Sequence, residues 1–218
     1  LPQNLNLIEC VKSGDLLKAV QLISKLDKEE IAKTDTNGKN VTHYIAENSL
    51  AKKEDVNSLV AAIKDKCPRF WFWKLVTACS RTGDSCFKIA LNKNNSVFIQ
   101  ALLSNAPNIT EDFVVGYISQ ISVFRSDEDV LKTQREKLSF LKECIPHAFS
   151  STEFNREVSR IEKTLKSGPF YCSNRNKMEV VKDILSVLND LTKNPQSLKQ
   201  PNLEALKSNR ANQGPSHT

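Results

Sequence analysis

Apolar residues recur along the chain with the spacing of short amphipathic helices, and these helices come in pairs separated by tight turns. The clearest pair lies between Thr82 and Ala106. A first apolar stripe is followed there by a reversal at residues 93–95 and by a second stripe from Val97 to Leu103. Apolar residues at intervals of three or four mark one face of a helix. Two short antiparallel helices cannot bury both apolar faces alone, so the pattern predicts similar pairs on either side.

A second pair is predicted in residues 5–26. Gly14 is suited to ending its first helix, since glycine takes positive φ without strain, and Asp15 is suited to capping the second. This is the same helix, turn, helix unit, and in the alignment it suggests, Lys12 to Asp15 corresponds to Lys93 to Ser96.

A third pair is predicted in residues 35–66. It begins with the turn signal Asp35-Thr36-Asn37-Gly38 and continues as two short helices joined by a longer loop. Gly38 and Gly83 are 45 residues apart. This spacing indicates a short repeat with an insertion.

The second half of the chain, residues 110–193, has longer apolar stripes. Ser126 is expected to cap one helix, and Ser150 with Glu153 forms the capping-box pattern of another. Four such helices predict two antiparallel hairpins that continue or cap the stack. Beyond them the apolar period fails, so residues 194–218 are predicted to form a flexible tail.

Composition supports an all-α fold. Six glycines in 218 residues are few for a protein rich in hairpin turns, while 39% hydrophobic and 26% charged residues are typical of a globular chain. We therefore expect an all-α solenoid of helical hairpins. No apolar run approaches the roughly 18 residues of a membrane helix, so no membrane span is expected.

Two of the turn-helix segments resemble the ankyrin repeat, whose signature T-P-L-H-x-A follows a β-turn in a period of about 33 residues. Counting from Gly38 the chain has N-V-T-H-Y-I, with His43 at the family's histidine position; counting from Gly83 it has S-C-F-K-I-A, with Ala90 kept and Lys88 in place of the histidine. Neither keeps the Thr-Pro pair, so these are expected to be divergent repeats. The resemblance makes residues 1–109 an ankyrin-like stack of a cap and two repeats.

The resemblance implies that the turn tips and the outward side of each first helix line a concave face that binds another protein, and that His43 serves the hydrogen bonds of the turn. For each tip and helix position an ordinary solvated surface residue is the alternative. The positions carried over are Asn37, Lys39, Asn40, Tyr44, Glu47, Thr82, Asp84, Lys88 and Asn92.

An aromatic insertion at residues 67–80 precedes the last repeat and is predicted to be a short extra helix. It contains Trp71 and Trp73. One interpretation is that its rings fill the space opened by the irregular period. The other is that Trp71 and Trp73 flank the concave face and anchor a partner, because four successive aromatic residues cannot all point inward from one helix.

Candidate catalytic chemistry is sparse, so we expect neither an enzyme nor a cofactor or metal site. Cys172 and His147 could form a nucleophile pair, but no local motif supports it. Six cysteines without CxxC spacing are predicted to be small buried side chains in a reducing, cytoplasmic compartment, with a disulfide framework as the formal alternative.

The net charge of +6 is not gathered in a basic block, since Lys52-Lys53 is the only adjacent basic pair. This argues against nucleic-acid binding, although a pI near 9 supports it. The sequence thus favours a protein–protein interaction module. The alternatives are an enzyme's accessory domain with its site in the C-terminal helices, or a weakly basic nucleic-acid-binding repeat protein. Its Asn, Lys and Ser content and degenerate repeats resemble, in style, ankyrin-bearing effectors that intracellular bacteria deliver into host cells, which would place it in the host cytosol on a host protein.

Overall fold

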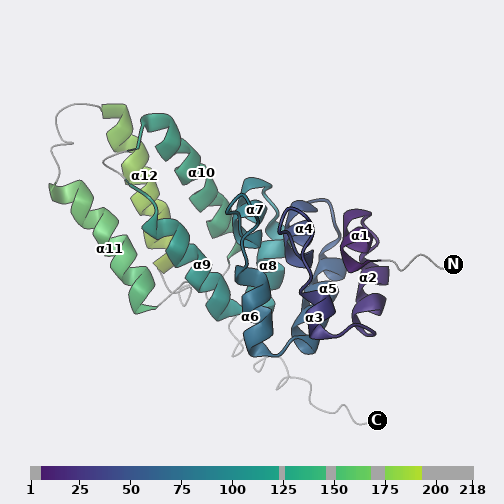
Figure 1. Cartoon of the computed structure of the whole chain (residues 1–218). Helices are drawn as coiled ribbons and strands as arrows, with labels where there is room; N and C mark the ends of the chain where they lie inside the picture. Colours follow the sequence, from purple (N-terminus) through teal and green to yellow (C-terminus); the bar gives the residue numbers. More distant parts are fainter. Residues whose placement is uncertain (1–5, 123–125, 146–150, 168–174, 193–218) are drawn as a thin grey trace, which may run out of the picture.

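The computed structural model describes residues 6–122, 126–145, 151–167 and 175–192, and these ranges form an all-α fold (Figure 1). They contain twelve helices and no β-strand, so the predicted all-α class is confirmed. The helices are α1 (Leu7–Lys12), α2 (Leu16–Ile23), α3 (Lys28–Ile31), α4 (Val41–Glu47), α5 (Lys53–Lys66), α6 (Arg69–Thr77), α7 (Cys86–Asn92), α8 (Ser96–Asn105), α9 (Pro107–Ser119), α10 (Glu128–Cys144), α11 (Thr152–Ser167) and α12 (Arg175–Thr192).

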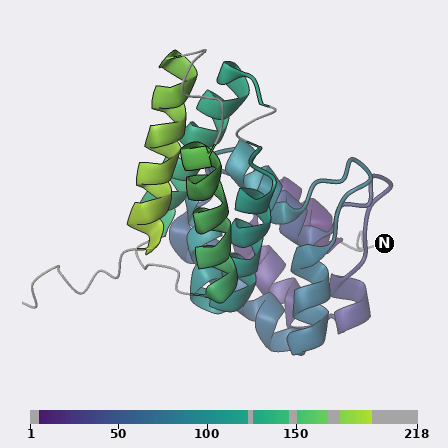
Figure 2. The same ribbon diagram turned by 90° about the vertical axis from the view of Figure 1, so that its left-hand side faces the viewer.

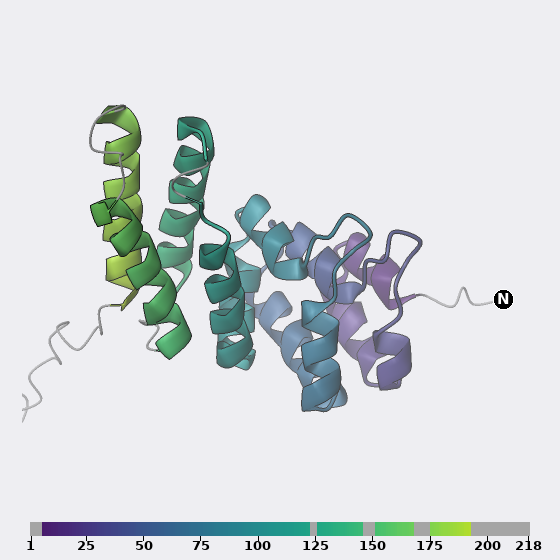
Figure 3. The same ribbon diagram turned by 60° about the vertical axis from the view of Figure 1, so that its left-hand side comes forward.

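The short helices of the first half stack in two rows. In one row α1 packs on α4 and α4 on α7, and in the other α2 packs on α5 and α5 on α8 (Figure 3). Each helix buries the apolar stripe that its sequence predicts, and the buried side chains form one continuous cluster from Leu7 to Leu191.

The long helices cover the end of the stack. Helix α9 packs on α8, α10 packs on α7, α8 and α12, and α11 lies against α9 and α12 (Figure 2). The residue before α10 is Asp127, so the predicted cap at Ser126 is wrong by one residue. Ser151 accepts a hydrogen bond from the Phe154 amide at 3.1 Å at the start of α11. Ser150, the predicted cap of that helix, lies outside the described residues.

Two tight turns precede α4 and α7 and are related by the predicted spacing of 45 residues. In the first, the Asp35 amide donates to the Lys39 carbonyl at 2.9 Å; in the second, the Ser80 amide donates to the Asp84 carbonyl at 3.0 Å. Positive φ at the fourth residue of each closes the turn. We call these the 35–39 turn and the 80–84 turn.

The two turns lie side by side because Gly38 lets them approach. The Arg81 amide donates to the Asn37 carbonyl at 2.9 Å. Gly38 has a φ of +72°, and a Cβ added there would meet the Arg81 amide nitrogen at 3.3 Å. Gly83 has a φ of +77° but faces open space. Only Gly38 therefore combines a left-handed backbone with close packing.

The turns inside the helix pairs correct the sequence alignment by one residue. Gly14, with a φ of +80°, is followed by Asp15, which caps α2; Asn94, with a φ of +51°, is followed by Asn95, which caps α8. Gly14 therefore matches Asn94, not Asn95. Asparagine tolerates the left-handed region, so Asn94 can take the backbone conformation that Gly14 takes in the first pair.

Helix α3 was not predicted. It has four residues and a capping box in which Asp27 and Glu30 each accept from the other's backbone amide. Its buried Ile31 lies 45 residues before Val76, which is buried near the end of α6. A four-residue helix shows a single apolar position, which is too little for a periodic signal.

Four of the cysteines are buried, free thiols, as predicted: Cys10, Cys67, Cys86 and Cys144. Burial raises the pKa of the thiols of Cys86 and Cys144 to about 12. The prediction is wrong for Cys79, which is exposed in an isolated β-bridge with Ser85. Cys172 lies outside the described residues.

None of the helices in the described ranges is long and apolar enough to cross a membrane.

Candidate functional site

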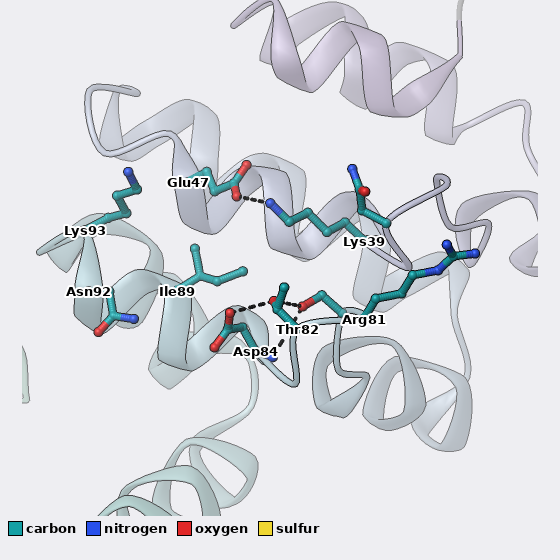
Figure 4. A pocket seen from close by; sticks show the side chains of 10 residues that line it. Lys39, Glu47, Arg81, Thr82, Asp84, Ile89, Asn92 and Lys93 are labelled. Atoms are coloured by element: carbon teal, nitrogen blue, oxygen red, sulfur yellow. Dashed lines mark hydrogen bonds and ion pairs between the residues drawn. The ribbon is translucent and has the colours of Figure 1, made fainter.

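A groove lies between the first helices α4 and α7 and is bounded by the two tight turns (Figure 4). Its volume is about 270 Å³. Typical small-molecule sites are larger, at about 300–1,000 Å³, and mostly apolar. The lining side chains are polar or charged apart from Ile89. The lining residues are Asn37, Lys39, Glu47, Ser80, Arg81, Thr82, Asp84, Ile89, Asn92 and Lys93.

Asn40 holds α4 in place from inside the protein. Its Oδ1 accepts from the Thr42 amide at 3.0 Å and caps the helix, while its Nδ2 donates to the Leu75 carbonyl at 2.8 Å. Only 1% of Asn40 is exposed, so its expected place among the partner-contacting turn tips is wrong. The reason is that the turn ends at Lys39 and the next residue is the helix cap.

His43 connects this cap to the second turn. Its Nδ1 accepts from the Asn40 amide at 3.2 Å, which leaves a proton on Nε2 to donate to the Asp84 carbonyl at 3.2 Å. Burial lowers the pKa of His43 below its ordinary value, so the neutral ring is favoured. His43 was expected to serve the hydrogen bonds of the turn in its own unit; it instead bonds to the backbone of its own helix cap and to the 80–84 turn of the next unit.

Both carboxylates of the groove are already engaged. Lys39 Nζ lies 2.5 Å from Glu47 Oε1, and this bond raises the pKa of Lys39. Lys88 Nζ lies 2.6 Å from Asp84 Oδ1, and hydrogen bonds from Lys88 and then Thr82 lower the pKa of Asp84. Each carboxylate of the groove is therefore held in an ion pair with a lysine.

A second, shallower groove continues the same face toward α1. It holds Tyr44, whose ring has Lys12 Nζ at 4.7 Å and Lys39 Nζ at 5.7 Å from its centroid. The Tyr44 hydroxyl donates to Asp35, and this bond lowers the pKa of the Asp35 carboxyl to about 2. Glu47 lines both grooves, so they form one surface across α1, α4 and α7.

Most of the residues expected at the binding face lie on this surface. The first groove is lined by six of them, Asn37, Lys39, Glu47, Thr82, Asp84 and Asn92; Tyr44 lines the second, and Lys88 is exposed beside Asp84.

The sequence-based choice missed Ser80, Arg81, Ile89 and Lys93, which also line the groove. The 45-residue spacing places Ser80 and Arg81 in the turn that contains Gly83, but it matches them with Asp35 and Thr36, which were not among the chosen positions. Lys93 follows Asn92 directly and was assigned to the reversal between helices.

The aromatic insertion forms α6. Some of its rings fill space in the interior, as the first interpretation expects, and others are exposed, as the second expects. Phe72 is buried, and Trp71 is half-buried with Lys28 Nζ at 5.2 Å and Lys74 Nζ at 5.3 Å from its ring centroid. Phe70 and Trp73 are 66% and 48% exposed and stack with centroids 6.5 Å apart. Neither Trp71 nor Trp73 is among the residues lining the groove.

The described residues contain no cluster of three or more His, Cys, Asp or Glu side chains that could hold a metal ion. Cys172 and His147, the nucleophile pair weighed from the sequence, both lie outside the described residues. Comparisons of the chain with models of protein families, with curated proteins and with solved structures found no match.

Proposed function

We propose that this chain is a protein–protein interaction module of the ankyrin-like kind, which binds a segment of another protein along the face of α1, α4 and α7. The supporting observation is the groove between α4 and α7. Six of the residues that the repeat register assigned to the binding face line it, although they come from two turns and two helices.

The geometry of the groove supports binding in preference to catalysis. Its carboxylates are held in ion pairs with Lys39 and Lys88, and its histidine neighbour is buried with both ring nitrogens hydrogen-bonded. A general base needs a lone pair directed at the substrate. An ordered polar wall with fixed donors and acceptors instead suits the recognition of a polypeptide at little entropic cost.

The resemblance in style to effectors of intracellular bacteria makes a host protein the partner that we favour, with the host cytosol as the compartment. Four buried free thiols are consistent with a reducing environment. This part of the proposal rests on the sequence resemblance and on the cysteines, and the groove does not depend on it.

Site-specific photo-crosslinking tests the proposal. A photoreactive amino acid is placed at Asn92, which is exposed in the groove, or at Ser58, which is exposed on α5 in the other row. In lysate, a discrete protein adduct is expected from position 92 and not from position 58. Equal adducts from both positions, or none from position 92, would contradict binding through this face.

A further inference from the structure

We propose that the partner segment bound in this groove is acidic, with carboxylates held by Arg81 and Lys93 and an apolar side chain over Ile89. The inference rests on the proposed function, because it names the chemistry of the segment that the same groove takes. It follows from which charges of the groove are already neutralised and which are not.

The groove is lined by more cations than carboxylates, and both of its carboxylates are in ion pairs with lysines. Three cations, Lys39, Arg81 and Lys93, line it together with the carboxylates of Glu47 and Asp84. Glu47 is paired with Lys39, and Asp84 is paired with Lys88 from the adjacent helix surface. No carboxylate of the lining therefore remains to neutralise the two other cations.

The backbone of Arg81 is fixed by hydrogen bonds. Its amide donates to the Asn37 carbonyl, and its turn is closed by the hydrogen bond from Ser80 to Asp84. Among the described residues its guanidinium has no ion pair and no hydrogen bond, and the side chain is exposed. A guanidinium binds a carboxylate through two parallel hydrogen bonds, so a partner carboxylate is its natural ligand.

Lys93 supplies the second charge at the opposite end of the groove, beyond Ile89 (Figure 4). It is the C-cap residue of α7 and is exposed. Its neighbour Asn92 accepts a hydrogen bond from Lys137 of α10 at 2.5 Å, which brings one more cation to this end. A cation at a helix C-terminus also stabilises the helix, and that local role alone is the alternative that the experiment must separate.

The two carboxylates of the groove favour a peptide over a nucleic acid. Glu47 and Asp84, each in an ion pair, lie between the two free cations, so the described lining of the groove has no unbroken row of free cations to follow a continuous chain of phosphates. A peptide presents both carboxylates and backbone N–H groups, so it can satisfy the cations and still donate to Glu47 and Asp84. The two free cations are therefore separated along the groove, and this separation suits acidic side chains spaced along a polypeptide.

The test begins with selection of random peptides displayed on phage against the full chain, followed by affinity measurement on a fluorescent synthetic copy of the most enriched peptide. Enrichment of Asp and Glu flanking an apolar residue is expected. Affinity should fall at least about tenfold in the Arg81→Gln/Lys93→Gln double variant, because each Gln keeps most of the stem and loses the charge. It should also weaken between about 50 and 300 mM NaCl.

Three further proteins make the result decisive. Lys53→Gln/Lys64→Gln removes two exposed charges from α5 and should leave the affinity unchanged. Asn92→Trp fills the groove and should abolish binding of any occupant. Each variant must keep the wild-type midpoint of urea unfolding, as expected for surface substitutions.

The outcomes separate the inference from the proposed function. Neutral or basic peptides that bind Arg81→Gln/Lys93→Gln normally but not Asn92→Trp would overturn the acidic partner and leave the interaction module standing. Peptides that tolerate Asn92→Trp, or no enriched peptide at all, would overturn both. A single-stranded oligonucleotide of about 20 thymidines is the competitor. If it displaces the peptide and binds more tightly than the peptide does, the inferred occupant of the groove is a nucleic acid and not an acidic peptide.

Discussion

The side-chain amide of Asn95, which caps α8, donates to the backbone carbonyl of Ala46 near the end of α4 at 3.0 Å. It also reaches the Ile45 carbonyl at 3.2 Å, while its Oδ1 accepts from the Phe98 amide at 3.0 Å. The last carbonyls of a helix have no partner within the helix. One asparagine, 1% exposed, therefore completes both the start of α8 and the end of α4.

Replacing Asn95 with Ala should lower the free energy of unfolding by about 2–4 kcal/mol, as the sum of a lost cap and the Ala46 carbonyl left unsatisfied in the interior, since the Ile45 carbonyl still accepts from the Asn48 amide. Asn95→Asp keeps the capping acceptor but cannot donate, so it should be at least as damaging. Urea unfolding measures both. Asn108→Ala, at an exposed position of α9, is the control and should change stability by less than about 0.5 kcal/mol. A mild Asn95→Asp effect would show that only the cap matters.

Gly38→Ala and Gly83→Ala form a matched pair that separates backbone strain from packing. Both residues have positive φ, so each alanine should cost about 1 kcal/mol for the left-handed conformation. Gly38→Ala should cost more, because its Cβ would press on the Arg81 backbone at 3.3 Å and separate the two turns. Urea unfolding gives the difference, and equal losses would mean that the turns can shift apart freely.

Protonation of His43 should lower the free energy of unfolding as the pH falls from about 7.5 to 5.5. Burial lowers its pKa in the folded state below its usual value, so the unfolded state binds the proton first and gains from acidification. The stability that the neutral His43 ring contributes is complete above the pKa of His43 in the unfolded state. It is lost as the pH falls from there through the lower pKa of the folded state.

His43→Gln tests this pH dependence, since it should be less stable overall but lack this part of the slope. Chemical denaturation at several pH values compares the two proteins, which share His147 and His217. Parallel profiles of wild type and His43→Gln would contradict the assignment.

The thiols should differ sharply in reactivity. Cys79 is exposed, whereas Cys86 and Cys144 are buried with pKa values raised to about 12, so they contain almost no thiolate at neutral pH. With a maleimide in native buffer, peptide mass spectrometry should find Cys79 modified within minutes and Cys86 and Cys144 only after denaturant is added. Cys79→Ser should leave the labelling of the other two unchanged. Modification of Cys86 as fast as that of Cys79 would mean that α7 opens readily.

Much of the fold was predictable because its signals are local. The turn glycines at 38 and 83, the capping of α2 by Asp15 and the apolar stripes are carried by residues a few positions apart, and backbone sterics act over that range. Errors of one residue occurred where two residue types satisfy the same requirement, as when Asn94 takes the left-handed position held by Gly14 in the first pair.

The candidate site was predictable only in part. The repeat register found Lys39, Glu47 and Asp84, because helix periodicity and turn position decide which side chains face outward. It could not exclude Asn40, whose side chain finds its partner in the carbonyl of Leu75, nor find Arg81, whose place depends on how closely two turns approach.

The sequence by itself determined that the chain is helical, the approximate positions of the helix pairs, and the spacing of 45 residues between the two turns. Only the tertiary structure decided that Asn40 and Asn95 are internal cross-links, that Phe70 and Trp73 stay exposed, and that Arg81 and Lys93 share one groove. The physical reason is distance along the chain. Helices and turns depend on neighbours within a few residues, whereas the partners of Asn40 and Asn95 lie 35 and up to 50 residues away and meet them only when the helices stack.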